Sequence, residues 1–384
     1  MPFVAPCRRN RTATGRVPIG FRASVPFVEP AHKPSALAQN LYREVARCQS
    51  APPSPLAPWQ SEPLVSCADS DDALRSSGTL RLLIGVQSTL GNRARIRRNA
   101  IRETWFRWAS MGRTALACFV VGTHNGLEPP REEVTAHRDL WVLDVPDSCL
   151  ISISKMFAWW RRAAELVGSS GSGIRHVAKV DDDSFIHIPN LEADLLSLHC
   201  HGNRLYYGAL ASTGYDPATF QKCGFAAGRH QSLGLYRRYL CAQRGAKPPF
   251  PFAVGALQVL SPTLVWHIAT DTSVTAFVNR SEHELDLHES HDEDVVLGYW
   301  LSLLHWSSPM QRLTYARLPP KPHRLMRVDL GCQRLDEYHL SPEENGTIVL
   351  HGMKYKQSMM FTWNVTRQKR PFNAVLCSRE SGAA

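Results

Sequence analysis

The segment HVAKVDDDSFIHIPNL, residues 176–191, decides the organisation of the chain, because a short apolar run ends there in three adjacent aspartates. The run VAKV predicts a buried strand, and the stretch that begins with SFIHIPNL predicts a helix. Carboxylates repel one another, so Asp181, Asp182 and Asp183 need a cation or a substrate that neutralises them. The segment therefore predicts a ligand site at the carboxyl end of a strand.

Buried strands and amphipathic helices also alternate before this segment. Predicted strands cover residues 80–88, 115–122, 140–146 and 175–183, and predicted helices cover residues 93–109 and 151–167. In the first helix Ile96, Ala100, Ile101, Trp105 and Trp108 recur near helical spacing, with arginines expected on the opposite face. We expect an α/β fold with a Rossmann-like, mostly parallel central sheet flanked by helices, whose ligands bind at the carboxyl ends of the strands.

Composition divides the chain into a tail and one domain. The proline-rich stretch SAPPSPLAPWQSEP and the polar residues after it predict a disordered or stalk-like tail over residues 1–78. One domain is expected over residues 79–375, with a first half at 79–190 and a second half at 191–375. Of the 384 residues, 43% are hydrophobic, which is enough for a sizeable core. The net charge of +10 fits an anionic partner, although solubility alone would explain it as well.

The ten cysteines include no CxxC pair, which argues against a zinc ribbon or a thioredoxin-like site. They fit a few disulfides in an oxidising compartment and reduced core thiols equally well. No uncharged apolar run approaches ~18 residues, and the first residues lack the apolar core of a signal peptide. Either the protein is soluble, or the start of its gene lies upstream of Met1.

The three aspartates suit a hard divalent cation. Carboxylate oxygens are ligands for Mg²⁺ or Mn²⁺, and a cation at a strand end can bridge to a diphosphate and neutralise a leaving group. One aspartate could hold the metal while a neighbour binds a ribose or sugar hydroxyl. A solvated acidic turn is the alternative, but the strand before the cluster and the helix after it favour a ligand site.

A second acidic cluster lies in the stretch HESHDEDVVLGYWLSLL, residues 288–304. Asp292, Glu293 and Asp294 precede an apolar helical pattern, where the helix dipole stabilises acids. The same carboxylates could supply a general base that faces an acceptor hydroxyl. His288 and His291 are one residue too close for the HExxH helix of zinc metalloproteases, which disfavours a zinc hydrolase.

A histidine ends a further short strand pattern, TIVLHGMK, residues 347–354. A lone histidine is more often a packed or surface residue than a ligand. His351 therefore becomes a candidate ligand only if it completes a metal site begun by Asp183.

Six segments together resemble the β1,3-galactosyltransferase and β1,3-N-acetylglucosaminyltransferase family, which is related to Fringe. In the family's order they are RRNAIRETW, FVVG, KVDDDSF, PFPFAVGALQVLS, EDVVLG and VLHGMK, and they span about residues 80–355. The resemblance implies a GT-A fold with a nucleotide-sugar half and an acceptor half. It also implies a Mn²⁺ cofactor, a UDP-sugar donor and inversion at the anomeric carbon.

The resemblance assigns roles to single positions as well. It implies that the metal ligands are Asp183 and His351, and that the catalytic base is Asp294 with Glu293 as its neighbour. The residues implied to lie near the nucleotide and the donor sugar are Arg97, Arg98, Arg102, Lys155, Asp181 and Asp182. Asp294 would take a proton from the acceptor hydroxyl, which attacks from the face opposite UDP.

The chain departs from the family pattern in two segments. Leu257 and Gln258 stand where the family has glycine and tyrosine, and Cys149 and Ile151 stand where it has tyrosine and asparagine. Leucine does not allow the close backbone approach that glycine allows. A catalytically inactive relative that binds a sugar nucleotide or a glycan therefore remains an alternative.

The leading prediction is an inverting hexosyltransferase that moves galactose or N-acetylglucosamine from a UDP-sugar to a glycan acceptor, on protein or lipid, in β1,3 linkage. The family implies residence in the Golgi lumen or membrane, and membrane association of the full-length protein. A nucleic-acid binder would need basic and aromatic residues interleaved on one surface, whereas tryptophans at core positions interrupt the arginine-rich helix. We expect no nucleic-acid partner.

Overall fold

The protein is described by a computed structural model over the following residues: 42–44, 48–49, 64–123, 128–147, 152–168, 172–218, 220–223, 247–284, 293–304, 313–317, 336–339 and 347–367. The strands are β1 (Tyr42–Glu44), β2 (Leu82–Gln87), β3 (Ala115–Gly122), β4 (Leu140–Leu143), β5 (His176–Asp181), β6 (Ser184–Ile186), β7 (Leu205–Asp216), β8 (Gln221–Cys223), β9 (Lys247–Leu260), β10 (Leu313–Arg317), β11 (Asp336–His339) and β12 (Thr347–His351). The helices are α2 (Asp71–Ser76), α3 (Asn92–Glu103), α4 (Arg131–His137), α5 (Ser152–Val167), α6 (Ile188–Leu196), α7 (Pro262–Thr270), α8 (Thr272–Glu284), α9 (Glu293–Leu303) and α10 (Lys356–Arg367), with short 3-10 helices η2 (Trp105–Arg107) and η3 (His199–Arg204).

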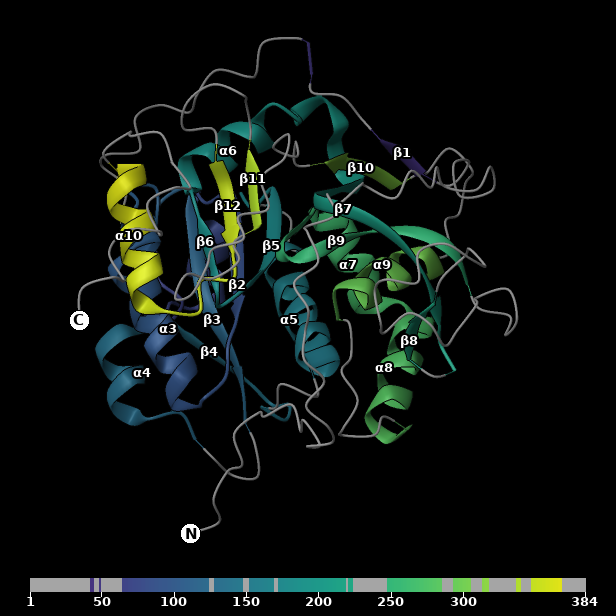
Figure 1. The fold of residues 1–384 in the computed structure, drawn as a ribbon, viewed down its shortest axis with the longest axis horizontal. Helices are drawn as coiled ribbons and strands as arrows, with labels where there is room; N and C mark the ends of the chain where they lie inside the picture. Colours follow the sequence, from purple (N-terminus) through teal and green to yellow (C-terminus); the bar gives the residue numbers. More distant parts are fainter. Residues whose placement is uncertain are drawn as a thin grey trace, which may run out of the picture.

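A central sheet organises the fold (Figure 1). Within the described residues it has nine strands, in the order β1–β10–β7–β9–β5–β2–β3–β4, with β8 paired to β7. The strands β5, β2, β3 and β4 are parallel neighbours, whereas β9 runs antiparallel to both β5 and β7. The predicted α/β fold with a mostly parallel sheet is therefore confirmed, and β9 and the short β8 are its antiparallel members.

A small antiparallel sheet, β11–β12–β6, stands beside the central one. The sequence pattern predicted a helix directly after the aspartates, but β6 comes first and α6 begins only at Ile188. A three-residue strand is too short to show a period in the sequence. Its pairing with β12 sets His351 opposite Ser184, next to the aspartates.

Helices cover both faces of the central sheet, and the alternation along β2 separates the two cores. Leu83 packs in a core with α5, α7, α8 and α9, whereas Leu82, Ile84 and Val86 pack in a second core with α3, α6 and α10. Figure 1 shows α3 beside α10 and, on the other side of the sheet, α5 close to α7. No helix in the described ranges has the length and apolar character needed to cross a bilayer.

The arginine-rich helix differs from its prediction at two positions. Ile96 is 53% exposed, although its spacing placed it on the apolar face, and Arg98 is fully buried, although it was expected on the polar face. The burial of Arg98 is possible because Glu133 pairs with its guanidinium. The helix also ends at Glu103, so Trp105 lies in η2.

The packed domain begins before residue 79, where the predicted tail was to end. Leu74 of α2 is fully buried in the core, and a disulfide joins Cys67 to Cys118 of β3. The predicted boundary was therefore too late, because one buried leucine and one cysteine give little signal in a polar segment. Apart from residues 42–44 and 48–49, the first 63 residues lie outside the described ranges.

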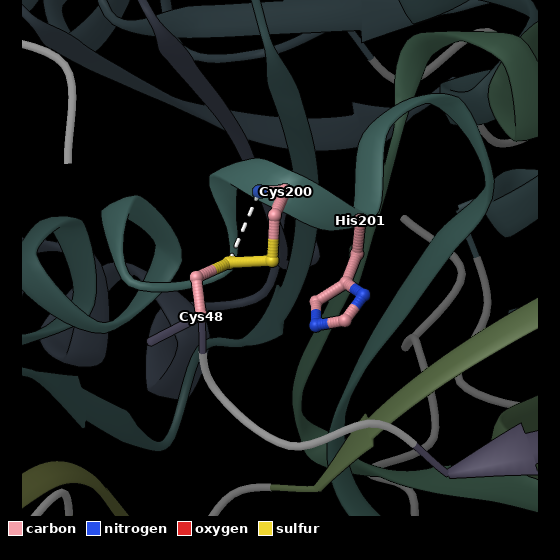
Figure 2. Close-up of side chains that lie close together, drawn as sticks. All are labelled: Cys48, Cys200 and His201. Atoms are coloured by element: carbon pink, nitrogen blue, oxygen red, sulfur yellow. Dashed lines mark hydrogen bonds between the residues drawn. A yellow bond between two sulfur atoms is a disulfide. The ribbon is translucent and has the colours of Figure 1, made fainter. Parts of the chain in front are cut away.

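A second disulfide joins Cys48 to Cys200 (Figure 2). The backbone N–H of Cys200 also donates to Sγ of Cys48 at 3.0 Å, and the imidazole of His201 lies close by. Both sulfurs are used in the disulfide, so these three residues hold no thiolate that could ligate a metal.

Candidate active site

A cavity of about 270 Å³ lies at the carboxyl ends of β2 and β5. Seven of the ten predicted site residues line it, namely Arg97, Lys155, Asp181, Asp182, Asp183, Glu293 and His351. The other side chains in its wall are Gln87, Ser88, Thr89, Met156 and Lys179. Arg98, Arg102 and Asp294 are not in the wall of the cavity.

Three of these residues form a group that could hold a metal ion. One ligand atom each from Asp181, Asp183 and His351 lies within 4.8 Å of the others. Nε2 of His351 lies 3.1 Å from Oδ1 of Asp183 and 3.5 Å from Oδ2 of Asp181. Two carboxylates and an imidazole fit a divalent cation such as Mn²⁺. The sequence placed Asp181 near the ribose, whereas the structure places it beside the two predicted ligands.

Lys179 is a site residue that the sequence analysis missed. Its side chain is 1% exposed, and its Nζ lies 2.7 Å from Oδ1 of Asp181 and 3.5 Å from a carboxylate oxygen of both Glu293 and Asp294. Burial alone would lower the pKa of Lys179, but these three carboxylates outweigh it and raise the pKa. The signal was a lysine inside the apolar strand VAKV, two residues before the first aspartate.

The first turn of α9 brings the second acidic cluster to the same place. Burial, together with the neighbouring Asp294 and Asp181, raises the pKa of Glu293 to about 7 against the lowering effect of Lys179. The carboxylate of Asp294 faces β9, because a Cβ atom added to Gly255 would lie only 2.5 Å from its Oδ1. The same Cβ atom would lie 2.6 Å from Oδ2 of Asp181, so glycine is required at position 255 if the carboxylates of Asp181 and Asp294 are to keep their positions.

Asp182 points away from Lys179 and the metal-binding group, toward the part of the cavity wall that Arg97 and Ser88 form. Arg97 donates from Nε to Oδ1 at 2.7 Å and from Nη2 to Oδ2 at 3.1 Å, and the hydroxyl of Ser88 donates to Oδ2 at 2.9 Å. Burial raises the pKa of Asp182 despite the pairing with Arg97. This contact explains how one of the three adjacent carboxylates is neutralised without a metal.

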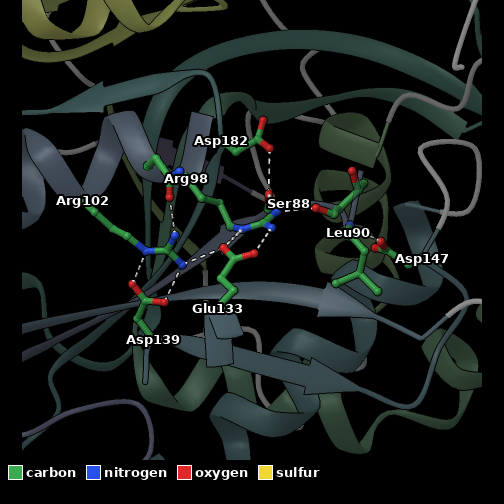
Figure 3. Close-up of polar contacts among 10 residues, drawn as sticks. Ser88, Leu90, Arg98, Arg102, Glu133, Asp139, Asp147 and Asp182 are labelled. Atoms are coloured by element: carbon green, nitrogen blue, oxygen red, sulfur yellow. Dashed lines mark hydrogen bonds and ion pairs between the residues drawn. The ribbon is translucent and has the colours of Figure 1, made fainter. Parts of the chain in front are cut away.

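The two other predicted nucleotide-binding arginines lie behind this wall (Figure 3). Arg98 donates two hydrogen bonds of 2.7 Å to Glu133 and one of 3.1 Å to the hydroxyl of Ser88. Arg102 pairs with Glu133 and with Asp139 at 2.7–2.8 Å. Burial would raise the pKa of Glu133, but the two arginines lower it to about 2. Arg98 and Arg102 therefore support the cavity wall and are not brought to the cavity itself.

Lys155 holds the loop that follows β2. Its Nζ donates to the carbonyl of Ser88 at 2.6 Å and lies 3.2 Å from Oδ1 of Asp147. The second oxygen of Asp147 accepts the backbone N–H of Leu90 at 2.5 Å, as Figure 3 also shows.

Glu133 and Asp139 gave no sequence signal, because a buried acid and an exposed acid look alike when the partner is distant in the chain.

The departures from the family pattern lie around β9. Leu257 is fully buried in the core with α3 and α6 and is not in the cavity wall, and Gln258 is fully buried in the sheet. Cys149 and Ile151 lie outside the described residues, as do His288, His291 and Asp292.

Comparisons with known proteins identify the family of the chain. The family model described as Galactosyltransferase matches residues 96–305. A search of curated proteins found no match. Among solved structures, the crystal structure of mouse xyloside xylosyltransferase 1 in its apo form matches at 12% identity over 59% of this chain and 82% of that chain, with a TM-score of 0.26. On the family match, which covers more than half of the sequence, the chain belongs to the galactosyltransferase family and is a glycosyl-transferring enzyme by class.

Proposed function

We propose that this chain is an inverting, Mn²⁺-dependent hexosyltransferase that moves galactose or N-acetylglucosamine from a UDP-sugar to a glycan acceptor, on protein or lipid, in β1,3 linkage. One observation carries the proposal. Asp181, Asp183 and His351 lie close to Glu293 and Asp294 at the carboxyl ends of the parallel strands β2 and β5. Family membership supports glycosyl transfer, and this cluster supports the metal-dependent form of that reaction.

The residues that would hold the cation are Asp183 and His351, with Asp181 beside them. A bound divalent cation would supply stabilisation of the negative charge that grows on the leaving diphosphate. Lys179 keeps Asp181 oriented at 2.7 Å and lowers the repulsion among the carboxylates.

The opposite wall would bind the nucleotide. Arg97 lies in the cavity wall and is 25% exposed, so it can reach an anionic ligand while it orients Asp182. Asp182 would accept a hydrogen bond from a ribose or sugar hydroxyl. Lys155 in the wall and Arg98 behind it would fix Ser88 and the loop that follows β2, and Arg102 would hold Glu133, the partner of Arg98.

Asp294 is the proposed base, which would accept the proton of the acceptor hydroxyl at its carboxylate as that hydroxyl attacks the anomeric carbon. Glu293 is a second candidate for this role, because it lines the cavity and its pKa of about 7 suits proton transfer at neutral pH. Comparison of Asp294→Asn with Glu293→Gln separates the two carboxylates.

The two disulfides support an oxidising compartment for the proposed activity. The Golgi lumen, as implied by the family, is such a compartment, and we propose it as the site of action.

The test is UDP release from a panel of UDP-sugars, with Mn²⁺ or with EDTA, by wild type, Asp183→Ala, Asp294→Asn and Glu293→Gln. We expect one donor to turn over only with Mn²⁺, and we expect Asp183→Ala and one of the two α9 variants to abolish turnover. If no donor turns over in the presence of a broad set of acceptor sugars, the enzymatic proposal fails. Titration with UDP would then show whether the chain is a binding relative.

A further inference from the structure

The antiparallel strand β9 carries a large bulge next to the acidic cluster. In its pairing with β7, Gly208 lies opposite Gln258 and Leu210 lies opposite Ala253. One residue of β7 therefore faces four residues of β9, residues 254–257. Bulges of this kind bend a strand and re-aim its residues, and they occur often beside active sites.

The bulge places Gly255 next to the carboxylates of Asp181 and Asp294. A Cβ atom at position 255 would lie 2.5 Å from Oδ1 of Asp294 and 2.6 Å from Oδ2 of Asp181. The two carboxylates come from different elements, α9 and β5, and both lie close to the backbone of Gly255. The position of the bulge therefore decides how much room the carboxylates of Asp181 and Asp294 have.

The side chain of Gln258 joins the two ends of the bulge. Nε2 of Gln258 donates to the carbonyl of Ala253 at 2.7 Å and lies 3.5 Å from the carbonyl of Asp294. The backbone N–H of Ala253 in turn donates to the hydroxyl of Tyr206 at 2.8 Å. Gln258 is fully buried, so water cannot replace its hydrogen bond.

We propose that Gln258 is a positioning residue for the transfer reaction: its amide clamps the bulge in β9 and so fixes Gly255 between the metal-side carboxylate Asp181 and the proposed base Asp294. The inference rests on the proposed function for its catalytic consequence, but the clamp itself is a property of the chain. Gln258 of β9 also pairs in register with Lys179 of β5, so Gln258 lies next to the lysine whose ammonium group contacts the acidic cluster. Glutamine at this position, where the family has tyrosine, thus has a defined task in this chain.

The test compares Gln258→Met with Tyr207→Phe. Methionine keeps the length and removes the donor. Tyr207→Phe removes one buried hydrogen bond, of 2.7 Å to Asp194, from the strand that pairs with β9 and is not part of the clamp. Hydrogen exchange of the peptides that cover residues 253–260 and 293–297 is measured for both variants, together with melting temperature, kcat and KM for the donor.

We expect Gln258→Met to raise exchange in these two segments and to lower kcat about ten-fold or more, with KM for the donor within about two-fold. We expect Tyr207→Phe to lower the melting temperature by a similar amount and to leave exchange in the two segments and kcat unchanged. Unchanged exchange in Gln258→Met overturns the clamp, and increased exchange with unchanged kcat overturns the positioning role. If wild type turns over no UDP-sugar, the proposed function fails and the catalytic role assigned to Gln258 fails with it, whereas the exchange data still decide whether the clamp exists.

Discussion

Nε2 of His351 lies 3.1 Å from Oδ1 of Asp183, although the two residues come from distant parts of the chain. The antiparallel pairing of β12 with β6 produces this contact, because it sets His351 opposite Ser184. The backbone N–H of Met353 also donates to the carbonyl of Asp183 at 2.7 Å and fixes the turn after β12. The C-terminal strand is therefore part of the candidate metal site.

Replacing His351 by alanine should weaken Mn²⁺ binding by at least ~10-fold, since even groups that only orient a ligand change metal affinity by that amount. Calorimetric titration of wild type and His351→Ala with Mn²⁺ measures the difference. The control is His137→Ala, because His137 is exposed in the last turn of α4. Equal dissociation constants for wild type and His351→Ala would remove His351 from the ligand set.

Arg97 and Arg98 are neighbours in the sequence, but their replacement by alanine should have different effects on stability and on donor binding. Arg98→Ala removes the bidentate partner of the buried Glu133, which keeps only Arg102, and should lower the free energy of unfolding by up to about 3–5 kcal/mol. Arg97→Ala, at a partly exposed position in the cavity wall, should cost less stability than Arg98→Ala, because solvent reaches the site and Asp182 keeps its hydrogen bond from Ser88, and it should raise KM for the donor.

Urea denaturation and donor titration of the two variants check this pair, with the exposed Arg95→Ala on the same helix as a control. A stable Arg98→Ala that has lost donor binding would instead return Arg98 to the nucleotide-binding role implied by the family.

The sequence predicted some features of the site and missed others. The alternation of strands and helices and the position of the aspartates at a strand end were predicted, because strand and helix patterns are local signals. The ligand pair Asp183 and His351 was implied by the resemblance to the family, and it stays a prediction. The burial of Arg98 was not predicted, since it depends on Glu133, which lies on another helix. The role of Gly255 was also hidden, because only the folded chain brings Asp294 within reach of β9.

The contribution of His187 to the stability of the protein should fall when the pH is lowered from 6.5 to about 4, whereas Glu293, with its raised pKa, acts in the opposite direction between pH 7 and its ordinary value. Nδ1 of His187 accepts the backbone N–H of Asn190 at 3.2 Å and caps α6, and burial lowers the pKa of His187 to about 4. In this pH window the unfolded chain binds a proton that the folded chain excludes, so acid favours unfolding, by at most ~1.4 kcal/mol per pH unit for one histidine. His176, whose pKa burial also lowers to about 4, acts in the same direction.

Urea denaturation at pH 7 and pH 5 measures this loss. His187→Asn keeps an oxygen that can cap the helix and has no titrating group, so its stability should depend less on pH than that of wild type. The same pH dependence in both proteins would show that His187 does not titrate in this window.

Gly255 should not tolerate a larger side chain. Alanine at this position places a methyl group within 2.6 Å of both Asp181 and Asp294, so either the bulge in β9 or the two carboxylates must move. A shift of about 1 Å in reacting groups can cost a hundred-fold in rate, and we expect Gly255→Ala to lose turnover on that order and to bind Mn²⁺ more weakly.

The matched control is Gly78→Ala, because a Cβ atom at position 78 meets no other atom within 4 Å. This variant should keep full turnover and should be as stable as wild type or slightly more so, since alanine restricts the unfolded chain. Turnover by UDP release and Mn²⁺ affinity by titration are measured for both variants. Full turnover in Gly255→Ala would mean that the carboxylates of Asp181 and Asp294 can separate without loss of function, and that the close approach of β9 is a packing feature alone.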